Sequence, residues 1–547
     1  MAFALRRRHV SVARRSAPVA GSARRLDWRF LLPTADDQAL DSLRLLSDDR
    51  TLADQMTELG LARKVVIGTQ GTERVDAVVS LSGSPAEMTI AVATLRPGGT
   101  FYCEIDRARL RHAGWSPSRL SRHLQSFGLV TAAYWRRRRG QRDSLFLPMD
   151  VPGAVPWYLR ELVDDSDARR RLGQRALSAF IRQDGRRLGL VARRYSLTGV
   201  VRAPDETARE RPAVTPGLLA VDTDDLVLPA VLARGEGPWS RVVLLPFGRT
   251  DRQPRDVVKL PRTAEHNWAT EREQRALTHI TRLLPPELAG TIPAAKGVRT
   301  WSGLCVGTES FLPGRPLAFP AVSSSGRSIS ASRLEGAVSW LIDLHLATRV
   351  GDVSADHPSA VEMLDEPLYR MVHLLALPAV FDGNSLCERY GAASATGSSI
   401  PIVWQHCDLT PHNVRWDGRR HSVVDWEAAR TGPALCDLVY LLLHWKWDDM
   451  PPLGIAPAEV FRRVFMSRQQ WPALMASEQV RRYCTAVGVD PRLTEPLLLN
   501  MLTQQALDRA DRTRHSGGDP NDDNNLYGEL IYLMLGATGS VPVWRPT

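Results

Sequence analysis

The octapeptide H-C-D-L-T-P-H-N, from His406 to Asn413, limits what this chain can fold into more than any other stretch. It places an imidazole, a carboxylate and a carboxamide, at His406, Asp408 and Asn413, within eight positions. A second carboxylate, Asp425, follows Asp408 by seventeen residues in S-V-V-D-W-E. The dipeptide D-G at 417–418 is typical of a β-hairpin turn, which would bring the two acidic segments to adjacent turns.

Phosphoryl transfer from ATP needs this combination of groups. A carboxylate orients and deprotonates the acceptor hydroxyl, and oxygen ligands hold the Mg²⁺ that neutralises charge on the phosphates. Asp408 suits the first role. Asn413 and Asp425 suit the second, since the amide oxygen of asparagine ligates a hard cation without adding charge. We expect His406 to brace the loop by hydrogen bonding rather than to transfer protons.

The pattern around this loop predicts two lobes of different character. Short strands are predicted at 230–233, 241–247 and 256–260, followed by a helix at 265–284. Downstream of Leu334 the apolar spacing is helical almost throughout, apart from paired short strands at 414–416 and 422–424. A small strand-rich lobe before a mainly helical one is the outline of an α+β, kinase-like fold.

These motifs resemble the aminoglycoside phosphotransferase and choline kinase family, relatives of protein kinases. The protein-kinase signatures H-x-D-x-x-x-x-N and D-F-G correspond to His406, Asp408, Asn413 and Asp425. The family form is seen in H-C-D-L-T-P-H-N-V and in V-V-D-W-E-A-A-R-T-G-P-A-L-C-D-L. The resemblance covers about 226–443. It implies ATP and Mg²⁺ as cofactors and gives Asp437 the role of holding the catalytic loop, although an ordinary acid at a helix N-terminus is the alternative.

The small lobe of such a fold supplies a lysine to the phosphates and a glutamate that positions it. Lys259, in D-V-V-K-L, is one of four lysines among 70 basic residues, and an arginine fork cannot replace a compact ammonium there. Glu273 is the predicted partner because Leu277 completes the family pattern E-x-x-x-L. Glu271 is its rival, and a solvated glutamate on a helix is the other reading.

Two further segments are candidates for nucleotide binding. Gly235 and Gly237 lie between two predicted strands and would free backbone N–H groups for phosphate oxygens. Pro238 removes one such donor, and a simple hairpin turn is the alternative. The stretch T-E-S-F-L-P-G-R-P, which contains Glu309 and Phe311, is expected to connect the lobes and to meet adenine.

The acceptor is expected between Asp408 and the helical region after Trp445. In H-W-K-W-D-D, ring faces and carboxylates could hold a cationic substrate. The residues concerned are Trp445, Trp447, Asp448 and Asp449. Burial of the tryptophans in a helix face is the favoured interpretation. The acids of 519–523 are a further candidate for contacts to the substrate, but a solvated loop is favoured for them.

The first part of the chain alternates short strands with helices, which favours a parallel sheet covered by helices. Strands are predicted at 30–32, 65–67, 75–80 and 100–105, and helical signals at 152–201. The spacing of V-D-A-V-V-S (75–80), L-R-P-G-G-T-F-Y-C-E-I (95–105) and L-Q-S-F-G-L-V-T-A-A-Y-W (124–135) resembles the latter half of a class I S-adenosylmethionine-dependent methyltransferase. The resemblance implies a Rossmann-like domain.

One departure argues against methyl transfer. Methyltransferases of this class bind their cofactor at a glycine-rich turn after the first strand, where only glycine lets the backbone approach the ligand closely. Here the predicted strand 30–32 is followed by P-T-A-D-D, with no glycine. A structural or docking role is therefore favoured for this segment.

The net charge of +10 raises the question of nucleic-acid binding. Residues 1–30 hold eight arginines against one acid, Asp27, which suggests a disordered basic arm or a transit peptide. Arginines 136–139 follow Tyr134 and Trp135, a juxtaposition found in nucleic-acid binders, but a solvated charge run is favoured. We expect no nucleic-acid partner.

The sequence has neither a predicted membrane span nor a paired-cysteine motif. No apolar run reaches the 18 residues of a membrane span. The six cysteines form no C-x-x-C pair, so they are expected to be free thiols in a reducing compartment, which places the protein in the cytoplasm.

Three functions fit these patterns: a phosphotransferase acting on the hydroxyl of a small molecule, which is favoured, a non-catalytic scaffold of two degenerate enzyme folds, and a bifunctional methyltransferase-kinase. Proline and charge at 203–216 mark a linker. The predicted division is a basic arm (1–28), a methyltransferase-like domain (29–150), a helical connector with linker (151–216), a small lobe (217–313) and a helical lobe (314–547).

Overall fold

A computed structural model of the chain describes most of its residues. The described ranges are 24–33, 39–106, 116–139, 143–163, 168–181, 185–190, 192–202, 216–219, 227–233, 235, 240–319, 326–355, 357–374, 398–445, 447, 457–467, 469–515, 519 and 526–536. Most of the predicted basic arm, nearly all of the predicted linker, Gly237, Asp448 and Asp449 lie outside them. Within these ranges no helix is both long and apolar enough to cross a membrane.

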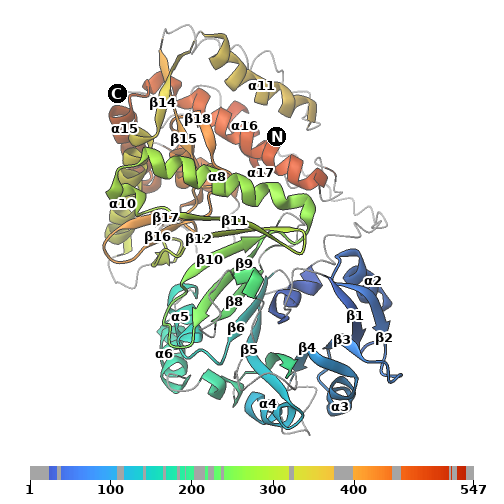
Figure 1. Ribbon diagram of the computed structural model, residues 1–547. Coiled ribbons are helices and arrows are strands. Elements are labelled where there is room, and N and C mark those ends of the chain that lie inside the picture. The colour runs from blue at the N-terminus through green and yellow to red at the C-terminus, as the bar shows by residue number, and fades with distance from the viewer. Residues whose placement is uncertain are drawn as a thin grey trace, which may run out of the picture.

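One mixed sheet of 12 strands runs through the first part of the chain and the small lobe (Figure 1). Its order is β11-β12-β10-β9-β8-β6-β5-β7-β4-β3-β1-β2. The elements of the first part are η1 (Arg24–Leu31), β1 (Leu40–Leu45), α2 (Arg50–Glu58), β2 (Ala62–Ile67), β3 (Val75–Ser80), α3 (Pro85–Thr94), β4 (Leu95–Asp106), α4 (Pro117–Gln125), β5 (Leu129–Arg139), β6 (Asp143–Pro148), α5 (Ala154–Glu161), α6 (Ala168–Ile181), η2 (Gly185–Leu190) and β7 (Arg194–Val201).

The predicted parallel arrangement is confirmed for four strands. β1 pairs in parallel with β2 and β3, and β3 pairs in parallel with β4. The helical prediction for 152–201 was wrong at its end, because β7 is a strand inserted antiparallel between β4 and β5. The strand predicted at 30–32 was also wrong: these residues end the 3-10 helix η1 and follow it, and the first strand is β1. The turn after β1, L-S-D-D at 46–49, still contains no glycine.

The segment η1 belongs to the folded core, so the boundary predicted after residue 28 falls too late. Leu26 and Trp28 are buried, and Trp28 stacks on Tyr102 of β4 with ring centroids 4.7 Å apart. Asp27 forms a buried ion pair with Arg262, at 2.9 Å between its Oδ1 and Nε. A basic arm can therefore extend no further than the residues before η1.

The small lobe continues the same sheet. Its elements are α7 (Pro216–Leu219), β8 (Val227–Ala233), β9 (Val242–Gly248), β10 (Asp256–Leu260), η3 (Ala264–His266), α8 (Asn267–Leu283), α9 (Pro286–Ala289), β11 (Ala295–Trp301) and β12 (Leu304–Ser310). β6 pairs with β5 on one side and with β8 on the other, so the hydrophobic core runs without a break from Leu26 to Val306. The predicted boundary between 216 and 217 does not divide this core.

The third part is mainly helical and packs around a second core. Its elements are β13 (Arg315–Pro316), α10 (Gly326–Ala347), β14 (Arg349–Ser354), α11 (Pro358–Leu374), β15 (Ser399–Gln405), β16 (Val414–Trp416), β17 (His421–Val423), β18 (Arg430–Pro433), α13 (Cys436–His444), α14 (Pro457–Phe461), η4 (Arg462–Met466), α15 (Trp471–Val487), η5 (Pro491–Leu493), α16 (Thr494–His515) and α17 (Leu526–Gly536). The hairpin β16–β17 was predicted, but the antiparallel sheet β14-β15-β18 was missed. β15 leads directly into the octapeptide at His406.

Candidate active site

The octapeptide forms a loop that is fixed from the following helix. The buried carboxylate of Asp437, in the first turn of α13, accepts hydrogen bonds from the backbone N–H of His406 (2.6 Å) and of Cys407 (2.8 Å). Cys407 has φ of +62°, a left-handed conformation that is unusual for a residue other than glycine. The two charge-assisted hydrogen bonds to Asp437 hold the loop in that conformation. Burial raises the pKa of the Cys407 thiol above its ordinary value.

His406 connects this loop to the segment that carries the second acid. Its Nδ1 accepts from the backbone N–H of Asp408 (3.2 Å), which leaves Nε2 protonated to donate to the carbonyl of Val424 (3.0 Å). The ring is buried against Trp426, with centroids 4.8 Å apart. Both ring nitrogens are used in structural bonds, so the geometry favours the bracing role predicted for this histidine.

Asp408 projects from the loop between two hydrogen-bond donors. Asn413 Nδ2 donates to its Oδ2 (3.0 Å), and the hydroxyl of Tyr440 donates to its Oδ1 (3.2 Å). Burial raises the pKa of Asp408 to about 6, although the nearby His406 opposes the shift. A carboxylate with a pKa near neutrality, held in a fixed orientation, is suited to accept a proton. Tyr440 was missed by the sequence analysis.

Asn413 and Asp425 flank the hairpin β16–β17 at its open end, where Asn413 precedes β16 and Asp425 follows β17. The backbone N–H of Val424 donates to the carbonyl of Asn413 (3.0 Å), which ties the two segments together. Asn413 Nδ2 is used by Asp408, so its amide oxygen is left for another ligand. Asp425 has φ of +73°, and its side chain is 40% exposed. One amide oxygen and one carboxylate are hard ligands that fit Mg²⁺.

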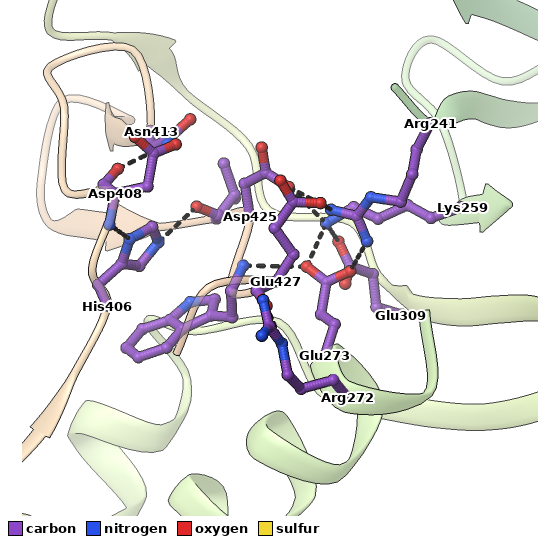
Figure 2. Close-up of polar contacts among 12 residues, drawn as sticks. Arg241, Lys259, Arg272, Glu273, Glu309, His406, Asp408, Asn413, Asp425 and Glu427 are labelled. Atoms are coloured by element: carbon purple, nitrogen blue, oxygen red, sulfur yellow. Dashed lines mark hydrogen bonds and ion pairs between the residues drawn. The ribbon is translucent and has the colours of Figure 1, made fainter. Parts of the chain in front are cut away.

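Lys259 lies at the centre of a cluster of acids. Its ammonium contacts Glu273 at 2.7 Å, Glu309 at 2.9 Å and Asp425 at 3.5 Å (Figure 2). Glu273, on α8, also accepts from the backbone N–H of Trp426 at 2.9 Å. The structure thus brings together Lys259, Glu273 and Asp425, three of the residues singled out from the sequence. The rival Glu271 instead lies beside the thiol of Cys305.

A second cation, Arg241, was missed. It lies just before β9, and its guanidinium contacts Glu273, Asp425 (2.7 Å) and Glu427 (2.9 Å). Figure 2 shows it beside Lys259, facing Asp425. Arg241 and Lys259 outweigh the burial penalty at Asp425 and hold the pKa of that carboxyl well below its ordinary value. Asp425 therefore stays ionised at any physiological pH.

Glu309 differs from its predicted role. The prediction placed it where adenine meets the backbone, but its side chain is buried in β12 and faces Lys259. Burial raises the pKa of Glu309 to about 7, and its Oε2 has no hydrogen-bond partner within the described ranges.

Phe311, in the connection after β12, packs edge-on against Trp157 of α5, with centroids 6.0 Å apart. Gly235 lies between β8 and β9 with φ of +74°, a conformation that favours glycine.

The two tryptophans considered for the acceptor are core residues, as the favoured interpretation of the sequence predicted. Trp445 is 6% exposed, and its Nε1 donates to Ser330 at 3.2 Å. Trp447 is 1% exposed and packs edge-on against Trp471. Neither ring face is open to a substrate. Both tryptophans are therefore buried, although they follow the end of α13 and do not lie on a helix face.

Comparison with known proteins bears on the region that contains this site. Residues 247–474 match a family model described as the phosphotransferase enzyme family. The match confirms the predicted resemblance for this part of the chain and supports a kinase-like fold there. No curated protein matches the chain. The methyltransferase resemblance of the first segment stays a prediction.

Several solved kinases and phosphotransferases are similar in structure. Aminoglycoside phosphotransferase APH(3'')-Id from Streptomyces rimosus ATCC10970 is 13% identical with a TM-score of 0.32, over 53% of this chain and 96% of that one. Choline kinase from Cryptosporidium parvum Iowa II is 10% identical with a TM-score of 0.34, over 58% and 93%. Macrolide 2'-phosphotransferase MphH from Brachybacterium faecium is 19% identical with a TM-score of 0.27, over 52% and 89%.

Proposed function

We propose that this protein is an ATP- and Mg²⁺-dependent phosphotransferase that moves the γ-phosphate to a hydroxyl of a small molecule in the cytoplasm. The observation that carries the proposal is the arrangement of Asp408. It is fixed beside Asn413, and its loop is bonded through His406 to the Asp425 segment, next to the Lys259–Glu273 pair.

The residues divide the work of an in-line displacement. The acceptor oxygen attacks the γ-phosphorus, the bond to the ADP oxygen breaks, and Asp408 takes the hydroxyl proton. Asn413 and Asp425 would hold the metal, which when bound neutralises charge on the phosphates. Lys259, positioned by Glu273, would bind the α- and β-phosphates.

The direct test is a screen for ADP release with Mg-ATP and a panel of amino-alcohols, aminoglycosides, macrolides and sugars. Turnover with one chemical class supports the proposal and names the acceptor. Binding of Mg-ATP in a thermal-shift experiment, with no turnover against any acceptor, would favour the scaffold instead.

We expect Arg241→Gln to raise the KM for ATP. With Mg²⁺-nucleotide bound, the guanidinium would donate to phosphate oxygens alongside Lys259, and hydrogen bonds between charged groups contribute about 1.5–3 kcal/mol, or roughly tenfold to a hundredfold. Steady-state kinetics against ATP would measure the change, with Arg275→Gln on the exposed side of α8 as control. A lower KM would mean that Arg241 competes with the nucleotide for Asp425.

The pKa of Asp408 predicts the pH dependence of turnover. The carboxylate must be ionised to accept a proton, so kcat/KM should fall as the pH drops through about 6. Tyr440→Phe removes a hydrogen bond that lowers this pKa, so the fall in kcat/KM on the acidic limb of the pH profile should occur at higher pH. Tyr532→Phe, at a half-exposed ring, is the control. A limb near pH 4, or no shift in Tyr440→Phe, would contradict the role of Asp408.

For the first segment we favour a structural or docking role over methyl transfer. The turn after β1, at 46–49, lacks the glycine that close approach of a cofactor requires. Isothermal titration with S-adenosylmethionine should therefore give no binding. A measurable affinity would revive the bifunctional enzyme.

A further inference from the structure

A basic cavity lies outside the active site, where the first part of the chain meets the small lobe. It has a volume of about 830 Å³ and is lined by α5 and α6, by the β9–β10 turn at 249–252, and by Arg315. This volume lies within the range of small-molecule sites. The wall is tightly built at Gly153, where a Cβ atom would lie 2.0 Å from the carbonyl oxygen of Asp251.

The lining of this cavity has a strong excess of positive charge. Five arginines line it: Arg160, Arg175, Arg249, Arg252 and Arg315. The single acidic lining residue, Asp251, is already neutralised, since its Oδ2 accepts from Arg255 Nε and from the backbone N–H of Gly248, both at 2.6 Å. It therefore cannot balance the arginines across the cavity.

Three of the guanidinium groups are open to a ligand. Arg175, Arg249 and Arg252 make no hydrogen bond or ion pair with any residue in the described ranges, and all three are exposed. Arg160 is paired with Glu161 at 2.7 Å, and Arg315 donates to the carbonyl of Val163 at 3.4 Å. Like charges gathered around one concave surface repel one another, and a bound anion removes that cost.

We propose that this cavity binds a small organic phosphoester that carries two or more negative charges. Arginine forks match phosphate oxygens two at a time, which suits several guanidinium groups around one ligand. The remaining wall includes Pro156 and Leu159, which offer apolar contact to the organic part of such a ligand. A flat basic surface for a nucleic acid would not need this concave, partly apolar shape.

The cavity is separate from the catalytic cluster. Lys259 is opposite Val243 near the start of β9, whereas the turn at 249–252 closes the other end of the same hairpin. The cavity wall nevertheless touches the connection between the lobes, because Trp157 of α5 packs against both Phe247 (5.5 Å between centroids) and Phe311 (6.0 Å). A ligand held here would contact the helix that supports this connection.

The test is isothermal titration of the full-length protein with inorganic tripolyphosphate, with and without saturating Mg-ADP. We expect binding in both conditions, because the two sites are separate. The double variant R249Q/R252Q should bind about tenfold more weakly or worse, since each substitution removes a charged donor. R249K/R252K should retain part of the affinity, because the positive charges remain.

Arg282 and Arg514 supply the matched control, since both are exposed arginines that do not line the cavity. The double variant R282Q/R514Q should bind as the wild type does. No binding to the wild type, equal losses in the two glutamine variants, or full displacement by Mg-ADP would overturn the proposal. Binding of single-stranded RNA but not of tripolyphosphate, with the same dependence on Arg249 and Arg252, would replace it with a nucleic-acid surface.

Discussion

Asp408→Asn is expected to abolish most of the turnover of this protein while leaving its fold intact. General-base catalysis contributes roughly 10²- to 10⁴-fold to the rate, and an amide cannot accept the proton from the acceptor hydroxyl. The neutral asparagine can accept only one of the two hydrogen bonds made to Asp408, but it also avoids the burial of a charge, so the free energy of unfolding should change little. The measurement is kcat for ADP release with the acceptor found in the screen, beside the thermal midpoint.

Asp417→Asn is the matched control for this loss. Asp417 belongs to the same hairpin, but its carboxylate caps the turn by accepting from the backbone N–H groups of Arg419 (2.7 Å) and Arg420 (2.9 Å). This variant should keep its kcat. Equal turnover in Asp408→Asn and the wild type would remove the proposed mechanism, whatever ligand the protein binds.

Asp27→Ala is expected to lower the free energy of unfolding by about 3–5 kcal/mol, because it leaves the guanidinium of Arg262 buried without its counter-charge. The side chains of Asp27 and Arg262 are 1% and 0% exposed, and two contacts of 2.9 and 3.1 Å join them. The pair joins η1 to the residues after β10, so its loss should loosen both. Urea unfolding would measure the change.

An exposed ion pair gives the scale for comparison. Asp41 and Arg63 are 70% and 69% exposed, and Asp41→Ala should change the free energy of unfolding by no more than about 1 kcal/mol. The double variant Asp27→Leu/Arg262→Met removes both buried charges, so it should be more stable than Asp27→Ala alone. If Asp27→Ala were as stable as Asp41→Ala, the buried ion pair would contribute no more to the free energy of unfolding than the exposed one.

The loop and hairpin of the candidate site could be predicted from the sequence because the spacing of their polar residues is local. His406, Asp408 and Asn413 share one loop, and Asp425 ends the next hairpin, so a short stretch carries the whole pattern. Arg241 carried no such signal, since only four of the 70 basic residues are lysines and one more arginine does not stand out. The unusual residue type, Lys259, was the informative one.

The remaining misses depend on pairing between distant strands. Glu309 meets Lys259 because β12 lies antiparallel to β10, with Gly307 opposite Lys259 and Glu309 two residues further along the same face. No local pattern specifies that register. β1 was overlooked for a similar reason: its L-D-S-L-R-L buries Arg44, whose guanidinium donates to the carbonyl of Gln70 at 2.6 Å. An arginine satisfied by a distant carbonyl looks like a surface residue in sequence.

The place of β6 in the sheet determines where the chain can be cut. A fragment that starts at residue 217, the expected lobe boundary, would lack β6. Residues 144–146 of that strand pair with β8 in the full chain. The exposed backbone of β8, in the apolar sequence V-L-P-A-V-L-A, would then be free to pair with another molecule. A shortened protein intended for enzymology therefore has to retain residues 143–148. Without β6, the unpaired edge of β8 would promote aggregation.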